Sequence, residues 1–352
     1  SVAGSFAGQL RELMSADELL RDAEVAMSRA KERGGDCYEV FDEQMRVRLF
    51  ERIQLESELR EALGRDELRL CYQPVVAVED GAMVSLEALV RWEHPRRGTL
   101  LPGGFISVAE EGELILPLGE WVIEEACRQL AHWRQAHPAG SSLRVSVNVS
   151  ARQLTPSLVD VVSRVLTRWD IHPGQLALEI TETLLIEQAD TSRIILESLK
   201  ELDVGIVLDD FGTGYSSLSY LKSFPLDQLK IDRSFIAELS DDARSAKIVS
   251  ATIEMARALG MTVVAEGVET ASQLEVLQRL GCDYAQGEYF SEPRPADAVS
   301  GLLDRALAQR PAAAAPAEAA VAGRSGAGSL ETPGEAEVRR RVAVGRVAGL
   351  LF

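Results

Sequence analysis

The residues with the clearest chemical potential are two adjacent carboxylates, Asp209 and Asp210, which follow an apolar run and precede a glycine-rich turn. A strand that buries Ile206 and Leu208 would present both side chains at its carboxyl end. Two negative charges held away from bulk water are costly unless a cation neutralises them. A purely structural alternative is that the pair caps a turn, because Asp and Gly are common turn residues. The pair therefore predicts either a cation site or a turn.

The same pattern recurs along the chain, because apolar, strand-like segments repeatedly carry an ionisable or amide residue at or near their ends. These residues are Glu87, Asn148, Glu179, Asp209, Asp210, Lys230, Glu266 and Gln286. Carboxylates with an amide oxygen form an all-oxygen ligand set that suits Mg²⁺ or Mn²⁺, whereas zinc normally recruits His or Cys. The four histidines show no metal-ligand spacing. Lys230 either balances charge or is a fixed cation that orients water and stabilises charge on a phosphate.

Strands that alternate with helices must bring these residues together. The strand-like segments are residues 70–78, 84–92, 143–150, 176–183, 204–210, 226–232, 262–270 and 284–290. Helical spacing occurs at residues 105–136, 156–169, 190–202, 243–259, 271–280 and 295–308. Eight strands over about 240 residues match an α/β fold of the (β/α)8 TIM-barrel type, which gathers the carboxyl ends of its strands at one mouth. A doubly wound open sheet is the alternative, and it would spread these residues along an edge.

Seven motifs occur in order along this frame. They are LEALVRW (86–92), NVSARQL (148–154), LEITET (178–183), DDFGTGYSSLSYL (209–221), LKIDRSFI (229–236), VVAEGVET (263–270) and AQGEYFSEP (285–293). Together they resemble the EAL-domain cyclic di-GMP phosphodiesterases, and the resemblance extends over about residues 54–307. It implies a barrel whose first strand is antiparallel to its neighbour. It also implies hydrolysis of one phosphodiester bond of cyclic di-GMP, which yields linear pGpG.

The resemblance also implies two divalent ions, Mg²⁺ or Mn²⁺, in one site. The implied ligands are Glu87, Asn148, Glu179, Asp209, Asp210 and Glu266, with Asp209 shared between the ions. Two ions would clamp the attacking water and the phosphate, which lowers the pKa of the water and neutralises charge. The implied catalytic residues are Asp209, Asp210, Lys230, which would hold the water, and Glu266, which is either the base or only a ligand. We expect Ca²⁺ to inhibit hydrolysis, because its longer, looser coordination positions water poorly.

Substrate contacts and a supporting loop follow from the same resemblance. Arg91 resembles the contact to the substrate phosphate, since a guanidinium suits bidentate phosphate recognition. Leu89 is a second expected substrate contact, and Gln286 is a third, to either guanine or phosphate. The segment 211–217 resembles a loop that supports the second ion and contributes to dimer contacts. The expected support residues for this loop are Glu182, Glu269, Phe211 and Gly212.

Two other functions compete with this enzyme. A catalytically silent cyclic di-GMP receptor that acts through a partner would be favoured by the loss of a ligand, yet every predicted ligand is present. Without the resemblance, the competing activity would be a metal-dependent barrel enzyme that abstracts a proton beside a carboxylate, with Lys230 as the base. Arg91 and the adjacent aspartates favour phosphodiester chemistry over that reaction.

The chain is expected to have four parts. Residues 1–41 resemble the end of a GGDEF domain without its catalytic core, and residues 42–63 predict a charged linker helix. Residues 64–308 form the predicted barrel, and residues 309–352 predict a disordered tail rich in Ala, Gly and Pro. We expect a homodimer through the barrel and an upstream sensory or GGDEF domain in the parent protein.

Composition restricts the partners further. The net charge of −18 disfavours binding to a nucleic-acid polymer, which requires a basic surface. Four cysteines without paired spacing suggest a reducing compartment. No segment is long and apolar enough to span a membrane, and no signal peptide is visible. The sequence therefore predicts a cytoplasmic location, although the parent protein could be anchored through residues outside this sequence.

Overall fold

The structure is a computed structural model of the 352-residue chain. It describes residues 26–27, 30–31, 43–136, 143–187, 189–212, 221–240 and 242–309. Most of the expected GGDEF-like segment, the tail after residue 309 and most of the predicted loop at 211–217 lie outside these residues. The chain divides into two compact units, one of residues 1–66 with 103–114 and one of residues 67–102 with 115–352.

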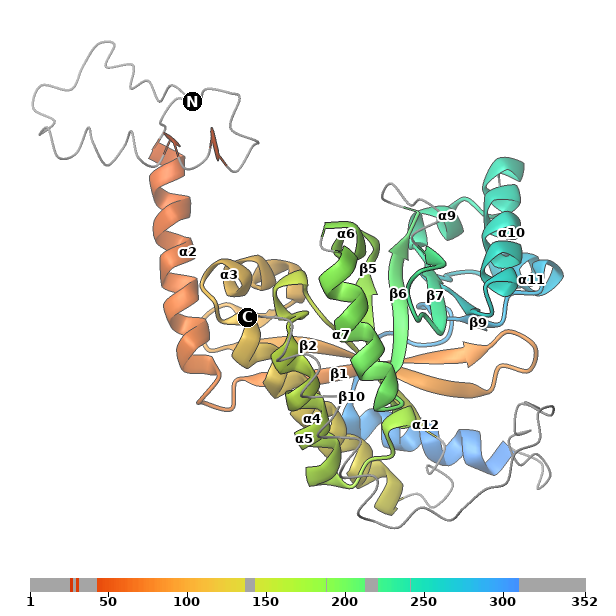
Figure 1. The fold of residues 1–352 in the computed structure, drawn as a ribbon, viewed down its shortest axis with the longest axis horizontal. Coiled ribbons are helices and arrows are strands. Elements are labelled where there is room, and N and C mark those ends of the chain that lie inside the picture. The colour runs from red at the N-terminus through yellow and green to blue at the C-terminus, as the bar shows by residue number, and fades with distance from the viewer. Residues whose placement is uncertain are drawn as a thin grey trace, which may run out of the picture. The chain divides into compact units, whose positions relative to one another are not determined.

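In the larger unit eight strands pair in a closed ring, and Figure 1 shows helices beside these strands. In order around the barrel these are β1 (Leu68–Ala77), β9 (Tyr284–Ala285), β8 (Thr262–Ala265), β7 (Gln228–Ile231), β6 (Gly205–Phe211), β5 (Leu176–Thr181), β4 (Arg144–Asn148) and β2 (Met83–His94). Pairing of β1 with β2 closes the ring. β1 is antiparallel to both of its barrel neighbours, whereas the other barrel pairs are parallel. The predicted barrel with an antiparallel first strand is confirmed, and the open sheet is excluded.

Helices connect most of the parallel strands. They are α4 (Ile115–Ala136), α5 (Pro156–Trp169), α7 (Ala189–Glu201), α10 (Ala243–Ala258) and α11 (Ala271–Leu280), and a further helix, α12 (Ala296–Gln309), follows the last strand. The helical spacing at 105–136 belongs to two helices, because α3 (Ile106–Glu111) ends at Gly112 and Glu113 has a positive φ of 59°. The short elements β3 (Gly98–Leu100), α6 (Glu182–Glu187), α9 (Arg233–Ala237) and β10 (Arg294–Pro295) were not predicted. Each has too few residues to show a periodic pattern.

Alternation along the strands decides which side chains enter the barrel. Large apolar residues on β2, β4, β5, β6 and β7 are buried at every second position: Leu86, Val145, Val147, Leu178, Ile206, Leu208 and Leu229. The residues between them face the opposite side of each strand, because successive side chains in a strand alternate. These intervening residues include Lys230 and three carboxylates that lie within 3.5 Å of its Nζ: Glu87, Glu179 and Asp209. The period-two pattern therefore positions the polar cluster.

The smaller unit contains α2 (Glu43–Ala62), where the sequence predicted a linker helix, together with α3. Leu59 of α2 is buried, whereas Phe50 and Ile53 are 64% and 54% exposed. Arg52 of α2 forms an ion pair with Glu111 of α3. Among the helices that the structure describes, none has the length and apolarity needed to cross a membrane.

One glycine beside Gln286 makes an unusually close backbone approach. A Cβ added at Gly287 would lie 2.1 Å from the carbonyl oxygen and 2.3 Å from the nitrogen of Val268. We predict that Gly287→Ala lowers the free energy of unfolding by about 2–3 kcal/mol, because backbone must move to admit the methyl group. Urea denaturation measures this change.

The matched control is Gly301→Ala in α12, where an added Cβ meets no atom within 4 Å. Alanine has the higher helix propensity, so this variant should be as stable as the unchanged protein or slightly more stable. Equal stability of the two variants would show that the contact to Val268 relaxes without cost.

Candidate active site

The predicted site residues gather at one end of the barrel, where the parallel strands have their carboxyl ends. Glu87 lies on β2, Asn148 ends β4, Glu179 lies on β5, Asp209 and Asp210 lie near the end of β6, Lys230 lies on β7, and Glu266 and Gln286 directly follow β8 and β9. The ring of strands therefore brings together residues that lie up to about 200 positions apart in the sequence.

Lys230 lies at the centre of this cluster and is 1% exposed. Its Nζ lies 3.1 Å from Glu87 Oε2, 2.8 Å from Glu179 Oε2, 3.5 Å from Asp209 Oδ1 and 2.5 Å from Glu266 Oε1. Burial by itself would lower the pKa of the ammonium group, but the surrounding carboxylates hold that pKa well above its usual value. Lys230 is therefore a permanent positive charge shared by four carboxylates.

Glu87 receives hydrogen bonds from three neighbours. Asn148 Nδ2 donates to Glu87 Oε1 at 2.8 Å, and Gln286 Nε2 donates to Glu87 Oε2 at 2.6 Å. Lys230 is the third donor, at 3.1 Å. Burial opposes ionisation of Glu87, but the charge of Lys230 and these hydrogen bonds hold its pKa below the usual value. Glu87 is therefore ionised, and the carbonyl oxygen of Asn148 is turned away from it.

Two other carboxyl groups in the cluster are easier to protonate than usual. Burial, with a contribution from the negative charge of Glu87, raises the pKa of Glu179 well above its ordinary value despite the contact with Lys230. Burial also raises the pKa of Glu266 to about 7, Lys230 opposes the rise, and the charges of Asp209 and Glu87 add to it. The cluster thus holds more negative charge than a single lysine neutralises.

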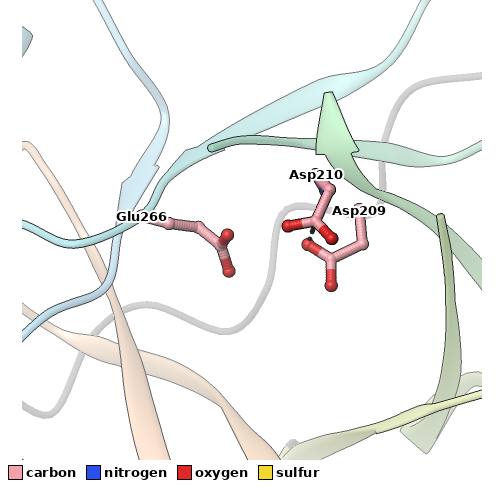
Figure 2. A group of neighbouring side chains, drawn as sticks. All are labelled: Asp209, Asp210 and Glu266. Carbon is pink, nitrogen blue, oxygen red and sulfur yellow. Dashed lines mark hydrogen bonds between the residues drawn. The ribbon is translucent and has the colours of Figure 1, made fainter. Parts of the chain in front are cut away.

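Asp209, Asp210 and Glu266 form a compact oxygen cluster (Figure 2). Each contributes a carboxylate oxygen, and these oxygens lie within 4.8 Å of one another. Figure 2 shows the Glu266 side chain extending toward the two aspartates, and the backbone N–H of Asp210 donates to Asp209 Oδ1 at 2.9 Å. Partial burial and the nearby charge of Asp209 raise the pKa of Asp210. An all-oxygen, electron-rich cluster of this kind fits a hard divalent cation such as Mg²⁺ or Mn²⁺.

The predicted loop contacts are only partly described by the structure. Glu182, which begins α6 and is 3% exposed, accepts a hydrogen bond from the backbone N–H of Gly212 through Oε2 at 3.1 Å. Gly212 has a φ of +100° and directly follows Phe211, the last residue of β6. Glu269 is exposed, and its backbone N–H donates to the side chain of Gln273. Glu182 thus holds the first described residues of the loop, whereas the support roles of Phe211 and Glu269 stay predictions.

The two substrate contacts expected on β2 lie on the same face of the strand as Glu87. Leu89 and Arg91 follow Glu87 at alternate positions toward the carboxyl end of the strand. Arg91 is partly exposed, and its Nη1 donates to the carbonyl oxygen of Val90 at 2.9 Å. The strand thus places a guanidinium beyond the carboxylate cluster.

Gln73 of β1 also belongs to this cluster, although its sequence context did not predict it as a site residue. It lies directly opposite Glu87 in the antiparallel pairing of β1 with β2. Its Oε1 accepts a hydrogen bond from Gln286 Nε2 at 2.9 Å, and its Nε2 donates to the carbonyl oxygen of Ser291 at 3.0 Å. The sequence shows only that a polar residue lies within an apolar strand. The role of this residue depends on how β1 pairs with β2, which the local sequence does not reveal.

Comparison with known proteins identifies the family. Residues 56–293 match the EAL domain family. The chain is 47% identical over 281 residues to the bifunctional diguanylate cyclase/cyclic di-GMP phosphodiesterase MucR of Pseudomonas aeruginosa, which covers 80% of this chain and 41% of MucR. It is 42% identical over 290 residues to the cyclic di-GMP phosphodiesterase PdeR of Escherichia coli, which covers 82% of this chain and 43% of PdeR. The chain spans less than half the length of these curated relatives.

A solved structure of the MucR phosphodiesterase in complex with c-di-GMP resembles the barrel. The two chains are 48% identical and superpose with a TM-score of 0.67, over 70% of this chain and 99% of the solved one. Nearly the whole solved domain therefore has a counterpart here. The sequence match, the identity to this domain and the shared fold agree, and the chain belongs to the EAL domain family.

Proposed function

We propose that this chain is a phosphodiesterase that hydrolyses one phosphodiester bond of cyclic di-GMP and releases linear pGpG. The observation that carries the proposal is the gathering of four carboxylates around Lys230 at the mouth of the barrel, with the amide of Asn148 bound to Glu87. Relatives with this domain, MucR and PdeR, are named as cyclic di-GMP phosphodiesterases. The silent-receptor alternative is not favoured, because every predicted ligand is present.

Two divalent ions, Mg²⁺ or Mn²⁺, complete the proposed site. We assign Glu87, Asn148, Glu179 and Asp209 to one ion and Asp209, Asp210 and Glu266 to the other. The close approach of the last three carboxylates supports the second assignment. When bound, such ions neutralise charge on the phosphate and lower the pKa of the attacking water.

The protein's own residues would perform the remaining tasks. Lys230 carries three N–H donors at a fixed position, so it can hold a water or stabilise charge on a phosphate oxygen. Glu266 would either accept the proton of the attacking water or serve only as an ion ligand, since its carboxylate lies in the cluster beside Asp209 and Asp210. Arg91 would bind the phosphate, since a guanidinium can donate two parallel hydrogen bonds to it.

The resemblance to the EAL-domain phosphodiesterases also carries proposals about the whole protein. We propose that the parent protein carries a GGDEF or sensory domain upstream of the barrel, acts in the cytoplasm and forms a homodimer through the barrel. The relatives are more than twice as long as the matched segment, which supports a longer parent.

A direct assay tests the function. The purified chain is incubated with cyclic di-GMP and Mg²⁺ or Mn²⁺, and pGpG is followed by chromatography. We expect product with either ion, none with EDTA, and little with Ca²⁺. Asp209→Asn is the matched inactive variant and should lower the rate at least about a hundredfold, because it removes the carboxylate shared by both proposed ions. Unchanged activity of this variant would refute the two-ion assignment, and binding without any product would make the barrel a receptor.

Lys230 should stabilise the metal-free protein. We predict that Lys230→Met lowers the free energy of unfolding in EDTA by about 3–5 kcal/mol, because it leaves buried carboxylates without their counter-ion. Mg²⁺ should restore part of this loss, since a cation that binds only the folded cluster stabilises it. Lys200→Met is the control: it removes a partly exposed ion pair to Asp227 and should cost about 1 kcal/mol or less. Similar losses in both variants would argue against the central role of Lys230.

The stability of the metal-free protein should also depend on pH through Glu266. Its pKa is about 7 in the folded protein and 4.5 ordinarily, so the folded state holds a proton that the unfolded state releases between these values. Stability should therefore fall as the pH rises from about 4.5 to about 7. Glu266→Gln should reduce this slope, as measured by the melting temperature in EDTA across that range. A slope that is the same in both proteins would show that Glu266 does not titrate there.

A further inference from the structure

A chain of three hydrogen bonds runs from the backbone to the carboxylate cluster through Gln73 and Gln286. The carbonyl oxygen of Ser291 can only accept, so the atom of Gln73 that faces it is Nε2, at 3.0 Å. Gln73 must then present Oε1 to Gln286, which donates from Nε2 at 2.9 Å. The second N–H of Gln286 Nε2 donates to Glu87 Oε2 at 2.6 Å, and a carboxylate also only accepts. The orientation of both amides is thus fixed from both ends.

This arrangement uses both N–H groups of Gln286. Its other polar atom, Oε1, is buried and has no hydrogen-bond partner among the residues that the structure describes, and the side chain is 3% exposed. A buried carbonyl oxygen without a donor is costly, so it is a place where a ligand donor is expected. An ionised phosphodiester offers no donor. Gln286 in this orientation therefore suits an N–H or O–H group and not a phosphate oxygen.

The backbone of Gln286 is held in place by hydrogen bonds and packing, so only the side chain of this residue can change its orientation. Gln286 N–H donates to the carbonyl oxygen of Ala265 at 2.9 Å, and its own carbonyl accepts from Val268 N–H at 3.0 Å. Gly287 then packs against Val268 with no room for a Cβ. Glu87 alone would fix only one N–H of the amide and allow it to rotate about that bond. Gln73 takes the second N–H and so fixes the plane of the amide.

We propose that Gln73 is a positioning residue that makes Gln286 an acceptor-only contact for a hydrogen-bond donor in the active site. The inference rests on the proposed phosphodiesterase function, because it names a role within that same site. The donor is an N–H or O–H group, which either the guanine and ribose groups of the dinucleotide or the attacking water can supply. Gln73 itself makes no contact with the reacting atoms in this role.

A double-mutant cycle tests the coupling between the two glutamines. We expect Gln73→Leu alone to lower kcat/KM about tenfold, which is the size of effect seen when a residue that orients another side chain of a site is removed. In the background of Gln286→Leu the same change should have less than about a twofold effect, because the group that it orients is gone. Equal effects in both backgrounds would overturn the proposal. If Gln286→Leu is too slow to assay, the cycle is read in the dissociation constant for cyclic di-GMP.

The kinetic constants separate the two donors. A raised KM with unchanged kcat in Gln73→Leu indicates a donor on the dinucleotide, whereas a lowered kcat with unchanged KM indicates the water. The matched control is Gln228→Leu, which removes a hydrogen bond of 3.1 Å between glutamine and Thr262 on neighbouring strands of the same barrel. This variant should leave both constants within about twofold of the unchanged protein, because it lies outside the site.

A second measurement does not depend on turnover. The side-chain amide signals of Gln286, identified in ¹H–¹⁵N spectra by their loss in Gln286→Leu, should shift and exchange faster with solvent in Gln73→Leu. They should not change in Gln228→Leu. Unmoved signals in Gln73→Leu would overturn the proposal even if activity fell. If the unchanged protein binds cyclic di-GMP without hydrolysing it, the proposed function fails while the spectra and the binding cycle still decide the role of Gln73.

Discussion

The structure depends on one buried interaction, the ammonium group of Lys230 surrounded by four carboxylates. Burying any of these charges alone would cost several kcal/mol, so the lysine and its partners are stable only together. The partners come from β2, β5, β6 and the residue after β8, and Lys230 comes from β7. A strand that moved or paired in another register would leave an unpaired charge inside the barrel. The barrel therefore closes correctly only when the charges of the site are paired with one another.

The antiparallel first strand has a specific consequence for this site. In an all-parallel barrel each strand offers the site only the residues near its carboxyl end. β1 runs the other way, so Gln73, which lies in the middle of the strand, is set directly opposite Glu87. The inverted strand thus contributes a side chain that joins β1 to the segment after β9, where Gln286 in turn donates to Glu87 of β2. The antiparallel direction of β1 thus adds to the site a residue that orients Gln286, whereas a parallel strand would add a residue from its carboxyl end.

The alternation of strands with helices and the polar residues at strand ends predicted a barrel, with an open sheet as the alternative, and the resemblance to the EAL domains implied the barrel with its antiparallel first strand. Patterns of this kind are local: polar and apolar residues alternate along β4 up to Asn148, and β6 is an apolar run that ends at Asp209. The role of Gln73 was not predictable in this way, because it depends on a cross-strand register that only the folded pair of β1 and β2 defines. The division of residues 105–136 into two helices was also missed. Gly112 and Glu113 carry that signal, but a helical spacing continues on both sides of them.

The charge of the cluster indicates what it is built to hold. Glu87, Glu179, Asp209, Asp210 and Glu266 carry five negative charges when all are ionised, and Lys230 returns one, which leaves four. Without metal, burial together with this excess raises the pKa values of Glu179, Asp210 and Glu266, which makes these carboxyl groups easier to protonate. Two divalent cations would supply four positive charges, which equals the excess, and would compete with protons for the carboxylates. A single divalent cation would leave two negative charges without a counter-charge. The charge balance of the described residues therefore supports the proposal of two ions.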